Sequence, residues 1–183
     1  MLTLNFNPFP ILETERLFLR RLAITDVNEI LILRSDPETM KFIPRPLVKT
    51  IEDALEHIAI IDGRIATNEG INWAITLKGS SKLIGIIGHY RIMPEHYRAE
   101  IGYMILAEYN GKGIVTEAIK EVVKFGFEVM RLHSIEAVID PENYASAKVL
   151  EKNEFVKEAH FKENFFYEGR FLDSIIYSKL NKQ

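Results

Sequence analysis

Hydrophobic residues recur along the chain with two periods, and the shorter one marks strands. In the segment 71–77, apolar side chains at every second position, with Trp73 among them, are typical of a strand. The turn-forming segment 78–82 follows, so the next apolar run is expected to pair with this strand as a hairpin. Alternation and flanking turns predict strands at 16–22, 71–77, 83–92, 99–106 and 134–139, and two more on either side of Glu168-Gly169.

The longer period marks helices, and capping signals mark where they begin and end. Thr25 is placed to cap a helix that runs to Ser35, and Pro37 ends it because the residue before a proline avoids helical geometry. Thr50 and Asp53 form a capping box for a second helix. Further helices are predicted at 114–130 and, a short one, from near Asn143. The stripes expected to face inward are Val27, Ile30, Leu31 and Arg34; Ile51, Leu55 and Ile58; and Val115, Ala118, Ile119, Val122, Phe125 and Val129.

The order of these elements, β α α β β β α β α β β, predicts an α/β fold in which helices pack on the faces of a mixed (α+β) sheet. The strand, helix and strand within 99–139 are expected to form a right-handed parallel crossover. No internal repeat, low-complexity tract or linker interrupts the pattern. Residues 1–183 are therefore expected to form a single domain, with a core from about 12 to 180.

Composition and charge narrow the class of protein. Apolar residues are 47% and charged residues 27% of the chain, as in folded globular proteins. The net charge of −3 and the lack of a Lys/Arg block argue against a nucleic-acid partner. Because there is no cysteine, disulfides, thiolate nucleophiles and cysteine-ligated metals are excluded. The five histidines lack metal-ligand spacing, so no metal is expected.

The first residues and the longest apolar runs bear on location. The chain opens without the basic start and apolar run of a secretory signal, and no apolar run reaches the length of a membrane span. We therefore expect a cytoplasmic protein without a membrane partner, present as a monomer or a homodimer.

The loop 108–113, between a predicted strand and a long helix, contains Gly111 and Gly113. Glycines let a backbone turn tightly and approach a ligand closely, and the first amides of a helix form an anion site suited to a pyrophosphate. The alternative is that both glycines only permit a turn before the helix. The loop is not a P-loop, because Lys112 is followed by glycine, and it lacks the third glycine of a dinucleotide-binding fingerprint.

Several motifs that occur in one order resemble the acetyl-CoA-binding core of the GNAT superfamily, and in particular its RimJ/RimL-type branch. They are the segments 12–17, 99–105, 111–118, 143–146 and 149–155, together with Asp173 and Tyr177 near the end of the chain. The chain departs from the usual pattern at Glu108, where Gln or Arg is common, at Asn110, where an aromatic residue is common, and at Glu154, where glycine is common. None of these changes removes a backbone donor from the loop, and Glu108 is expected to point to solvent.

The resemblance implies a GNAT-like acyl-CoA N-acyltransferase fold: a mostly antiparallel central sheet, a parallel crossover at the cofactor site, and helices on both faces. It implies acetyl-CoA as co-substrate, with a strand that pairs with pantetheine, loop amides that bind the pyrophosphate, and an asparagine that binds the pantetheine arm. A backbone amide near Ile105 would then stabilise the oxyanion. The cofactor-binding residues implied are Met104, Ile105, Leu106, Gly111, Lys112, Gly113, Ile114, Val115, Asn143 and Ser146.

Glu100 and Ser146 are the candidate catalytic residues. Strand alternation places Glu100 on the face that it shares with Gly102 and Met104, where the resemblance places the thioester, so Glu100 is the candidate base. Its alternative role is that of a surface carboxylate paired with Arg98 or Arg91.

The spacing of Ser146 from Asn143 is similar to that of a serine proposed to protonate the leaving thiolate in RimL-like enzymes. Many other family members use a tyrosine four residues later, where this chain has Leu150. The alternative is that Ser146 only caps the helix or fills space in its first turn.

The resulting interpretation is an N-acetyltransferase (EC 2.3.1 type) in which a primary amine attacks the thioester of acetyl-CoA directly. The acceptor is a protein N-terminus, such as that of a ribosomal protein, or a small amine. The acidic surplus favours a cationic acceptor such as a polyamine or a basic N-terminus. The alternatives are a non-catalytic acyl-CoA-binding module and a scaffold without a small ligand. Acceptor choice is expected to depend on the segment 41–50, the helix after it and the loop 93–98. Trp73 is expected in the core, and His89 in the core or on the surface rather than facing the acceptor. The run 165–167 is expected to pack on the sheet, or at a subunit contact, rather than to line an acceptor groove.

Overall fold

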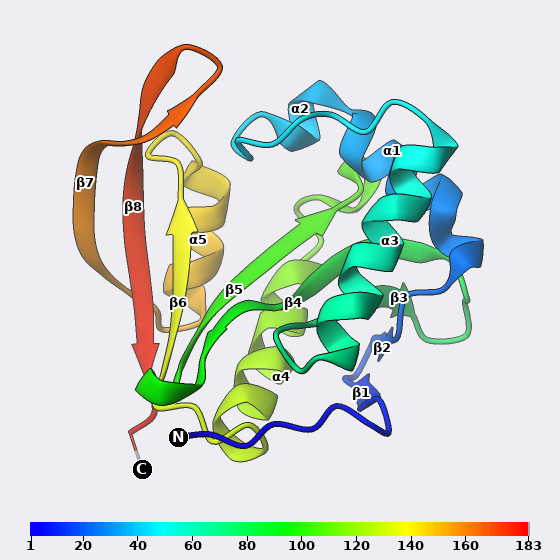
Figure 1. Ribbon diagram of the computed structural model, residues 1–183, viewed down its shortest axis with the longest axis horizontal. Coiled ribbons are helices and arrows are strands. Elements are labelled where there is room, and N and C mark those ends of the chain that lie inside the picture. The colour runs from blue at the N-terminus through cyan, green and yellow to red at the C-terminus, as the bar shows by residue number, and fades with distance from the viewer. Residues whose placement is uncertain (183) are drawn as a thin grey trace.

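The computed structural model describes residues 1–182, which form one sheet of eight strands in the order β1-β2-β3-β4-β5-β6-β8-β7 (Figure 1). The strands are β1 (Leu12–Glu13), β2 (Leu17–Arg20), β3 (Ile71–Leu77), β4 (Leu83–Met93), β5 (Arg98–Ile105), β6 (Ser134–Ile139), β7 (Val156–Tyr167) and β8 (Arg170–Leu180). The helices are α1 (Val27–Ser35), α2 (Pro37–Met40), α3 (Ile51–Ala66), α4 (Ile114–Glu128) and α5 (Tyr144–Lys152). Short 3-10 turns lie at Ile24–Asp26, Pro94–His96 and Ala107–Tyr109.

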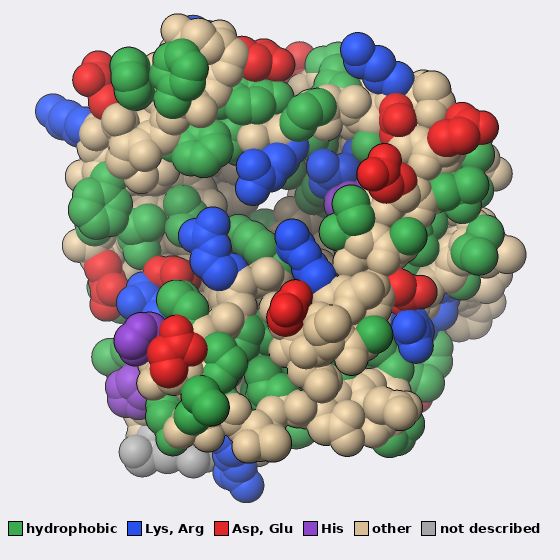
Figure 2. Space-filling view, viewed as in Figure 1, with side chains coloured by type: hydrophobic (Ala, Val, Ile, Leu, Met, Phe, Trp, Pro, Cys, Tyr) green, Lys and Arg blue, Asp and Glu red, His purple; other side chains and the backbone are tan. Residues whose placement is uncertain are grey.

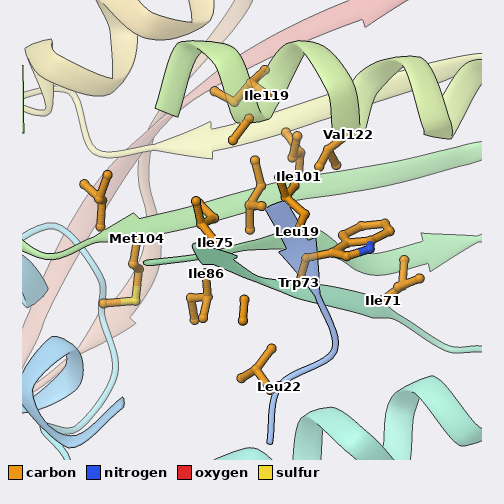
Figure 3. Close-up of a cluster of buried hydrophobic side chains, with 14 of the residues drawn as sticks. Leu19, Leu22, Ile71, Trp73, Ile75, Ile86, Ile101, Met104, Ile119 and Val122 are labelled. Atoms are coloured by element: carbon orange, nitrogen blue, oxygen red, sulfur yellow. The ribbon is translucent and has the colours of Figure 1, made fainter. Parts of the chain in front are cut away.

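Neighbouring strands run antiparallel except β5 and β6, which are parallel and joined through α4. The predicted mixed α/β class and the parallel crossover segment are confirmed. Helices α1 and α3 cover one face of the sheet, and α4 and α5 cover the other (Figures 1 and 3). Because both faces of the central strands are covered, their side chains are buried on both sides, as Figure 3 shows for β3, β4 and β5.

Trp73 lies in the core as expected, and His89, for which core and surface were both open, lies there too. Trp73 is fully buried, packs edge-on against Phe125 with ring centroids 5.3 Å apart, and donates its Nε1 proton to the Pro10 carbonyl oxygen at 2.7 Å. His89 is also fully buried, with Nε2 3.1 Å from the Val122 carbonyl oxygen of α4. Burial lowers the pKa of His89 to about 4, so the ring is neutral at pH 7. Both side chains therefore belong to the core.

The expected start of α1 is wrong in detail. Thr25 lies inside the 3-10 turn that precedes the helix and does not cap it. The Asp26 carboxylate organises this turn instead, because it accepts a hydrogen bond from the Ala23 amide at 2.8 Å and forms an ion pair with Arg20 at 2.7 Å. The helix ends at Ser35 as predicted, but the chain then forms α2, which the sequence analysis missed along with the two-residue strand β1.

The expected inward faces of two helices are also wrong in part. The Thr50–Asp53 capping box of α3 is confirmed, but Ile51 and Leu55 are exposed. The helix turns a different stripe toward the sheet, and its members are Ala54, Ile58, Ile61 and Ile65. Val129 is exposed because α4 ends one residue before it.

The aromatic run 165–167 does not pack on the sheet as expected. The Phe165 and Phe166 side chains are 38% and 60% exposed. They lie on β7, the outermost strand of the sheet. Within residues 1–182, no helix combines the length and the apolar character needed to cross a bilayer.

Candidate active site

The sheet opens between β5 and β6. The two strands pair only over residues 98–100 of β5, and beyond that point they spread apart (Figure 1). On the other edge of β5, the Leu106 amide donates to the Ile84 carbonyl oxygen at 2.9 Å. Because amides alternate in direction along a strand, those of Tyr103 and Ile105 point to the free edge. This edge offers backbone hydrogen bonds to an extended ligand.

The glycine loop lies beside this opening, at the start of α4. Gly111 and Gly113 have φ angles of +71° and +74°, in the left-handed region that favours glycine. Gly113 caps α4, and its carbonyl oxygen accepts from the Glu117 amide at 3.1 Å. The amides before Glu117 have no partner within the helix, so they and the helix dipole form a site for an anion. The Glu108 side chain is 60% exposed and pairs with Lys82 at 3.3 Å, so it points to solvent as expected.

The N-terminal motif holds this loop in place, which sequence reasoning missed. Glu117 accepts hydrogen bonds from the Thr14 hydroxyl at 2.5 Å and from Arg16 Nε at 2.6 Å. Arg16 also donates to the Lys112 carbonyl oxygen of the loop at 3.0 Å. Burial alone would raise the pKa of Glu117, but these hydrogen bonds lower it below its ordinary value. Arg16 and Glu117 are 101 positions apart, so no local pattern could reveal the pair.

The start of α5 lies on the α4 side of the opening. The Asn143 side-chain oxygen caps α5 by accepting from the Ser146 amide at 3.1 Å, so a capping role belongs to Asn143 rather than to Ser146. The Tyr103 hydroxyl is buried and makes no hydrogen bond of normal geometry to the rest of residues 1–182. Burial raises the pKa of Tyr103 to about 12, and the nearby Ser146 hydroxyl offsets part of this effect. Leu150 is fully buried one turn further on.

Glu100 lies on the opposite face of β5 and is almost fully buried, at 3% exposure. Tyr90 donates its hydroxyl proton to Glu100 Oε1, and Arg91 forms an ion pair with Oε2 at 3.2 Å. Burial raises the pKa of Glu100, while Tyr90 and Arg91 oppose this by stabilising the carboxylate. Arg98 pairs with Glu136 instead. The alternative of an exposed surface carboxylate is therefore wrong, although the expected pairing with Arg91 is present.

A β-bulge and a glycine bring Tyr90 to Glu100. Opposite β5, His89 pairs with Ile101 and Arg91 pairs with Glu100, so Tyr90 is the extra residue of the bulge. A Cβ atom at Gly102 would lie 2.6 Å from the Tyr90 ring, so only glycine leaves room for it. Sequence reasoning did not find this contact, because the bulge shifts the register of β4.

Positive side chains from α1 and from the loop after α2 face the same opening. Arg34 of α1 lies 3.7 Å from Met104 Sδ, and Met104 points to the α1–α3 side of the sheet (Figure 3). Arg45 lies close enough for its positive charge to offset part of the rise that burial causes in the pKa values of Tyr90 and Glu100. Figure 2 shows that this side of the molecule is hollowed between α2 and β6, with Lys and Arg side chains around the hollow.

The site residues expected from the sequence thus form two groups around the open part of β5. Glu100 and Met104 face α1 and α3, whereas Ser146, Asn143 and the glycine loop lie on the side of α4 and α5. The free edge of β5, with Ile105, lies between them. No three His, Asp or Glu side chains in the described chain gather as metal ligands.

Comparison with known proteins gives one consistent result. Residues 16–156 match the family described as "Acetyltransferase (GNAT) domain". An uncharacterized N-acetyltransferase of Bacillus subtilis, YoaA, is 35% identical over 170 residues, which cover 93% of this chain and 96% of YoaA. The crystal structure of a GNAT-family acetyltransferase from Bacillus anthracis has a TM-score of 0.85 at 30% identity and covers 95% of this chain and 100% of that one. A Vibrio cholerae spermidine N-acetyltransferase in complex with CoA and spermine has a TM-score of 0.80 at 26% identity and covers 91% of this chain and 96% of that one.

Proposed function

The chain belongs to the acetyltransferase (GNAT) family and is an acetyl-CoA-dependent N-acetyltransferase, and we propose that Glu100 is the base that takes the proton from the attacking amine. The observation that carries this proposal is a buried carboxylate, held by Tyr90 and Arg91, on the β5 face that also presents Met104. The amine nitrogen forms a bond to the acetyl carbon while the carbon–sulfur bond breaks, so one proton must leave nitrogen and sulfur must gain one. Glu100 accepts the first of these protons, directly or through water.

The open edge of β5 and the glycine loop fit the shape and charge of acetyl-CoA. The amides of Tyr103 and Ile105 are free to pair with the extended pantetheine arm, and the Ile105 amide would also stabilise negative charge on the acetyl oxygen. The amides of the segment 111–115 would bind the pyrophosphate at the α4 N-terminus. Asn143 would hold the pantetheine arm from the start of α5.

Ser146 is proposed to protonate the departing thiolate. Its half-buried hydroxyl lies near that of Tyr103, at the point where β5 leaves β6. We expect Ser146→Ala to lower kcat by about tenfold while the Kd for acetyl-CoA stays within about threefold. Steady-state kinetics and calorimetry measure the two quantities, and Ser81→Ala, in an exposed turn, is the control. Full kcat in Ser146→Ala would assign this proton to water.

The acceptor is proposed to be a primary amine, either a protein N-terminus or a small molecule. The Vibrio cholerae relative, which was solved with spermine, supports a small amine. The loop that contains Arg45 and the β7–β8 hairpin lie on opposite sides of the opening (Figure 1), and the charge of Arg45 offsets part of the rise that burial causes in the pKa of Tyr167. These segments would contact an acceptor that reaches Glu100.

The test of the proposed base is Glu100→Gln, which keeps the shape of the side chain but cannot accept the proton. We expect kcat for CoA release to fall by about a hundredfold, the usual contribution of a general base. Calorimetric titration should give a Kd for acetyl-CoA within about threefold of the original. Glu128→Gln, at the exposed end of α4, removes one charge elsewhere and is the control. Unchanged kcat in Glu100→Gln would remove Glu100 from the mechanism, and acetyl-CoA binding without CoA release from any amine would favour a binding module.

A further inference from the structure

Arg34 lacks a counter-ion in the described part of the chain, whereas Arg91 of β4 and Arg98 of β5 each pair with a glutamate. Its Nε atom is buried without a hydrogen-bond partner, and its only polar contact in the described residues is with Met104 Sδ. Burial lowers the pKa of Arg34, and the positive charge of Arg45 lowers it further. Neither Arg34 nor Arg45 forms an ion pair with any acidic side chain of residues 1–182.

Three acidic side chains of this region have partners of their own. Glu100 is held by Tyr90 and Arg91, and Asp36 accepts from the first amides of α2 and from the Thr39 hydroxyl. Glu136 pairs with Arg98. Arg34 and Arg45 lie close enough for one positive charge to act on the other, and neither has an ion-pair partner among the described residues, although the whole chain carries a net charge of −3. Burying the guanidinium group of Arg34 without a partner is costly, and the exposed Arg45 adds a second positive charge, so the two arginines favour a ligand that brings negative charge.

His57 does not compensate the positive charge of Arg34. It lies on α3 near Arg34, and its Nε2 atom is buried without a hydrogen-bond partner. Burial, together with Arg34 and Arg64, lowers the pKa of His57 to about 4. The ring is therefore neutral at pH 7 and supplies no negative charge to either arginine.

Arg34 and Arg45 lie near the expected position of the acceptor rather than near the glycine loop. Arg34 contacts Met104 on the β5 face that carries Glu100, and Arg45 lies close enough for its charge to act on Tyr90, Glu100 and Tyr167. The glycine loop lies at the start of α4, which covers the opposite face of the sheet (Figures 1 and 3). An anion bound by Arg34 and Arg45 would therefore lie beside the attacking amine.

We propose that the acceptor is an amine that also carries a carboxylate or phosphate group, and that Arg34 and Arg45 bind this group while the amine lies next to Glu100. Guanidinium groups match the planar oxygens of carboxylates and phosphates with paired hydrogen bonds. The proposal rests on the proposed function, since it concerns the acceptor of that reaction. It replaces the sequence-based expectation of a polyamine, because net charge does not report the local charge of the opening.

The first experiment compares matched amines that differ only in the anionic group. Suitable pairs are free amino acids against their amides, phosphoethanolamine against ethanolamine, and serine dipeptides ending in glutamate against those ending in glutamine, with spermidine as the polyamine. The amine of an amino-acid amide has a lower pKa than the amine of the free amino acid, so at a given pH a larger fraction of it is neutral and reactive. A preference for the free amino acid therefore cannot come from the protonation of its amine. We expect kcat/KM to be at least about tenfold higher for the acidic member of the favoured pair. The carboxylate and phosphate pairs show which group is recognised.

Variants identify the residues that carry this preference. Arg45→Gln, in an exposed loop, should raise KM for the acidic amine by about tenfold, change KM for its neutral partner by less than about twofold, and leave KM for acetyl-CoA unchanged. Arg34→Gln should change the three KM values in the same way. Arg45→Lys, which keeps the positive charge, should raise KM for the acidic amine less than Arg45→Gln does. Lys124→Gln removes one exposed charge from α4 and is the control for net charge.

Equilibrium binding separates this proposal from the proposed reaction. The CoA-saturated protein is titrated with each member of a pair, which requires no turnover. The proposal is wrong if no acidic amine binds more tightly than its neutral partner. It is also wrong if spermidine is the best substrate and Arg45→Gln does not change kcat/KM for spermidine. Either result is compatible with an active acetyltransferase. If acidic amines bind through Arg45 but no CoA is released, the proposed reaction fails and the anion site stands.

Discussion

At the residue scale, the chemistry of the site depends on how β5 and β4 surround one carboxylate. Glu100 is buried, and burial favours its neutral form, whereas the Tyr90 hydroxyl and Arg91 favour the charged form that can accept a proton. Burial raises the pKa of Glu100 on balance, so the proposed base ionises at a higher pH than an exposed glutamate does. As the pH rises through this pKa, activity should increase, while the stability that comes from the neutral carboxyl group is lost.

The Tyr90 hydroxyl therefore sets where the acidic side of the pH–rate profile lies. Tyr90→Phe removes a donor that stabilises the carboxylate, so we expect the pKa of Glu100 to rise further and the acidic limb of kcat to move to higher pH. The acceptor amine titrates identically in both proteins, so the difference between the two pH–rate profiles reports the change in the pKa of Glu100. Tyr97→Phe, an exposed tyrosine in the β4–β5 connection, is the control. An acidic limb that does not move would mean that another group governs it.

At the element scale, the connection between the N-terminal segment and α4 fixes the anion-binding loop. Glu117 binds Thr14 and Arg16, and Arg16 binds the Lys112 carbonyl oxygen, so one network joins β1, β2 and the glycine loop. Glu117→Gln should weaken acetyl-CoA binding several-fold and lower the free energy of unfolding by about 1 kcal/mol near neutral pH. Calorimetry and urea denaturation measure the two effects. Glu121→Gln, one turn further along α4, is the matched control.

The pH dependence of this network has a definite sign. The pKa of Glu117 is lowered in the folded protein, so its contribution to stability is present above the ordinary value of 4.5 and is lost as the pH falls through the folded value. The difference in unfolding free energy between the original protein and Glu117→Gln should therefore shrink in acid. A difference that stays constant down to acid denaturation would show that the ionised carboxylate is not what stabilises the loop.

Elements that depend on local sequence were predicted well, and contacts between distant segments were not. Strands β3 and β6 have the bounds that alternation and flanking turns predicted. The bulge at Tyr90 and the pairing of Arg16 with Glu117 depend on how strands and helices meet, so no local pattern contains them. Arg34 did give a signal, because it is the one charged residue in the stripe of α1 expected to face inward.

At the scale of the whole molecule, the sheet consists of two parts that meet at a short junction. Strands β1 to β5 form one part and β6, β8 and β7 form the other, and only residues 98–100 of β5 pair across the boundary. Helix α4 links the two parts of the sheet and begins at the glycine loop. The glycine loop and the opening therefore belong to one candidate site. The sequence predicted the order of these elements, but the distance over which β5 and β6 remain paired is set by packing on both sides.

A ligand that adds a strand to the free edge of β5 should protect particular amides from exchange. In the free protein the Tyr103 and Ile105 amides point to the open edge, whereas those of Met104 and Leu106 point to β4 and are paired. We expect CoA to slow deuterium exchange at the first two and to change the last two little, as site-resolved NMR would show. CoA at about a hundred times its Kd should also stabilise the fold by about 2.7 kcal/mol, visible as a higher Tm. Stabilisation without protection at Tyr103 and Ile105 would mean that CoA binds this protein elsewhere than along the open edge of β5.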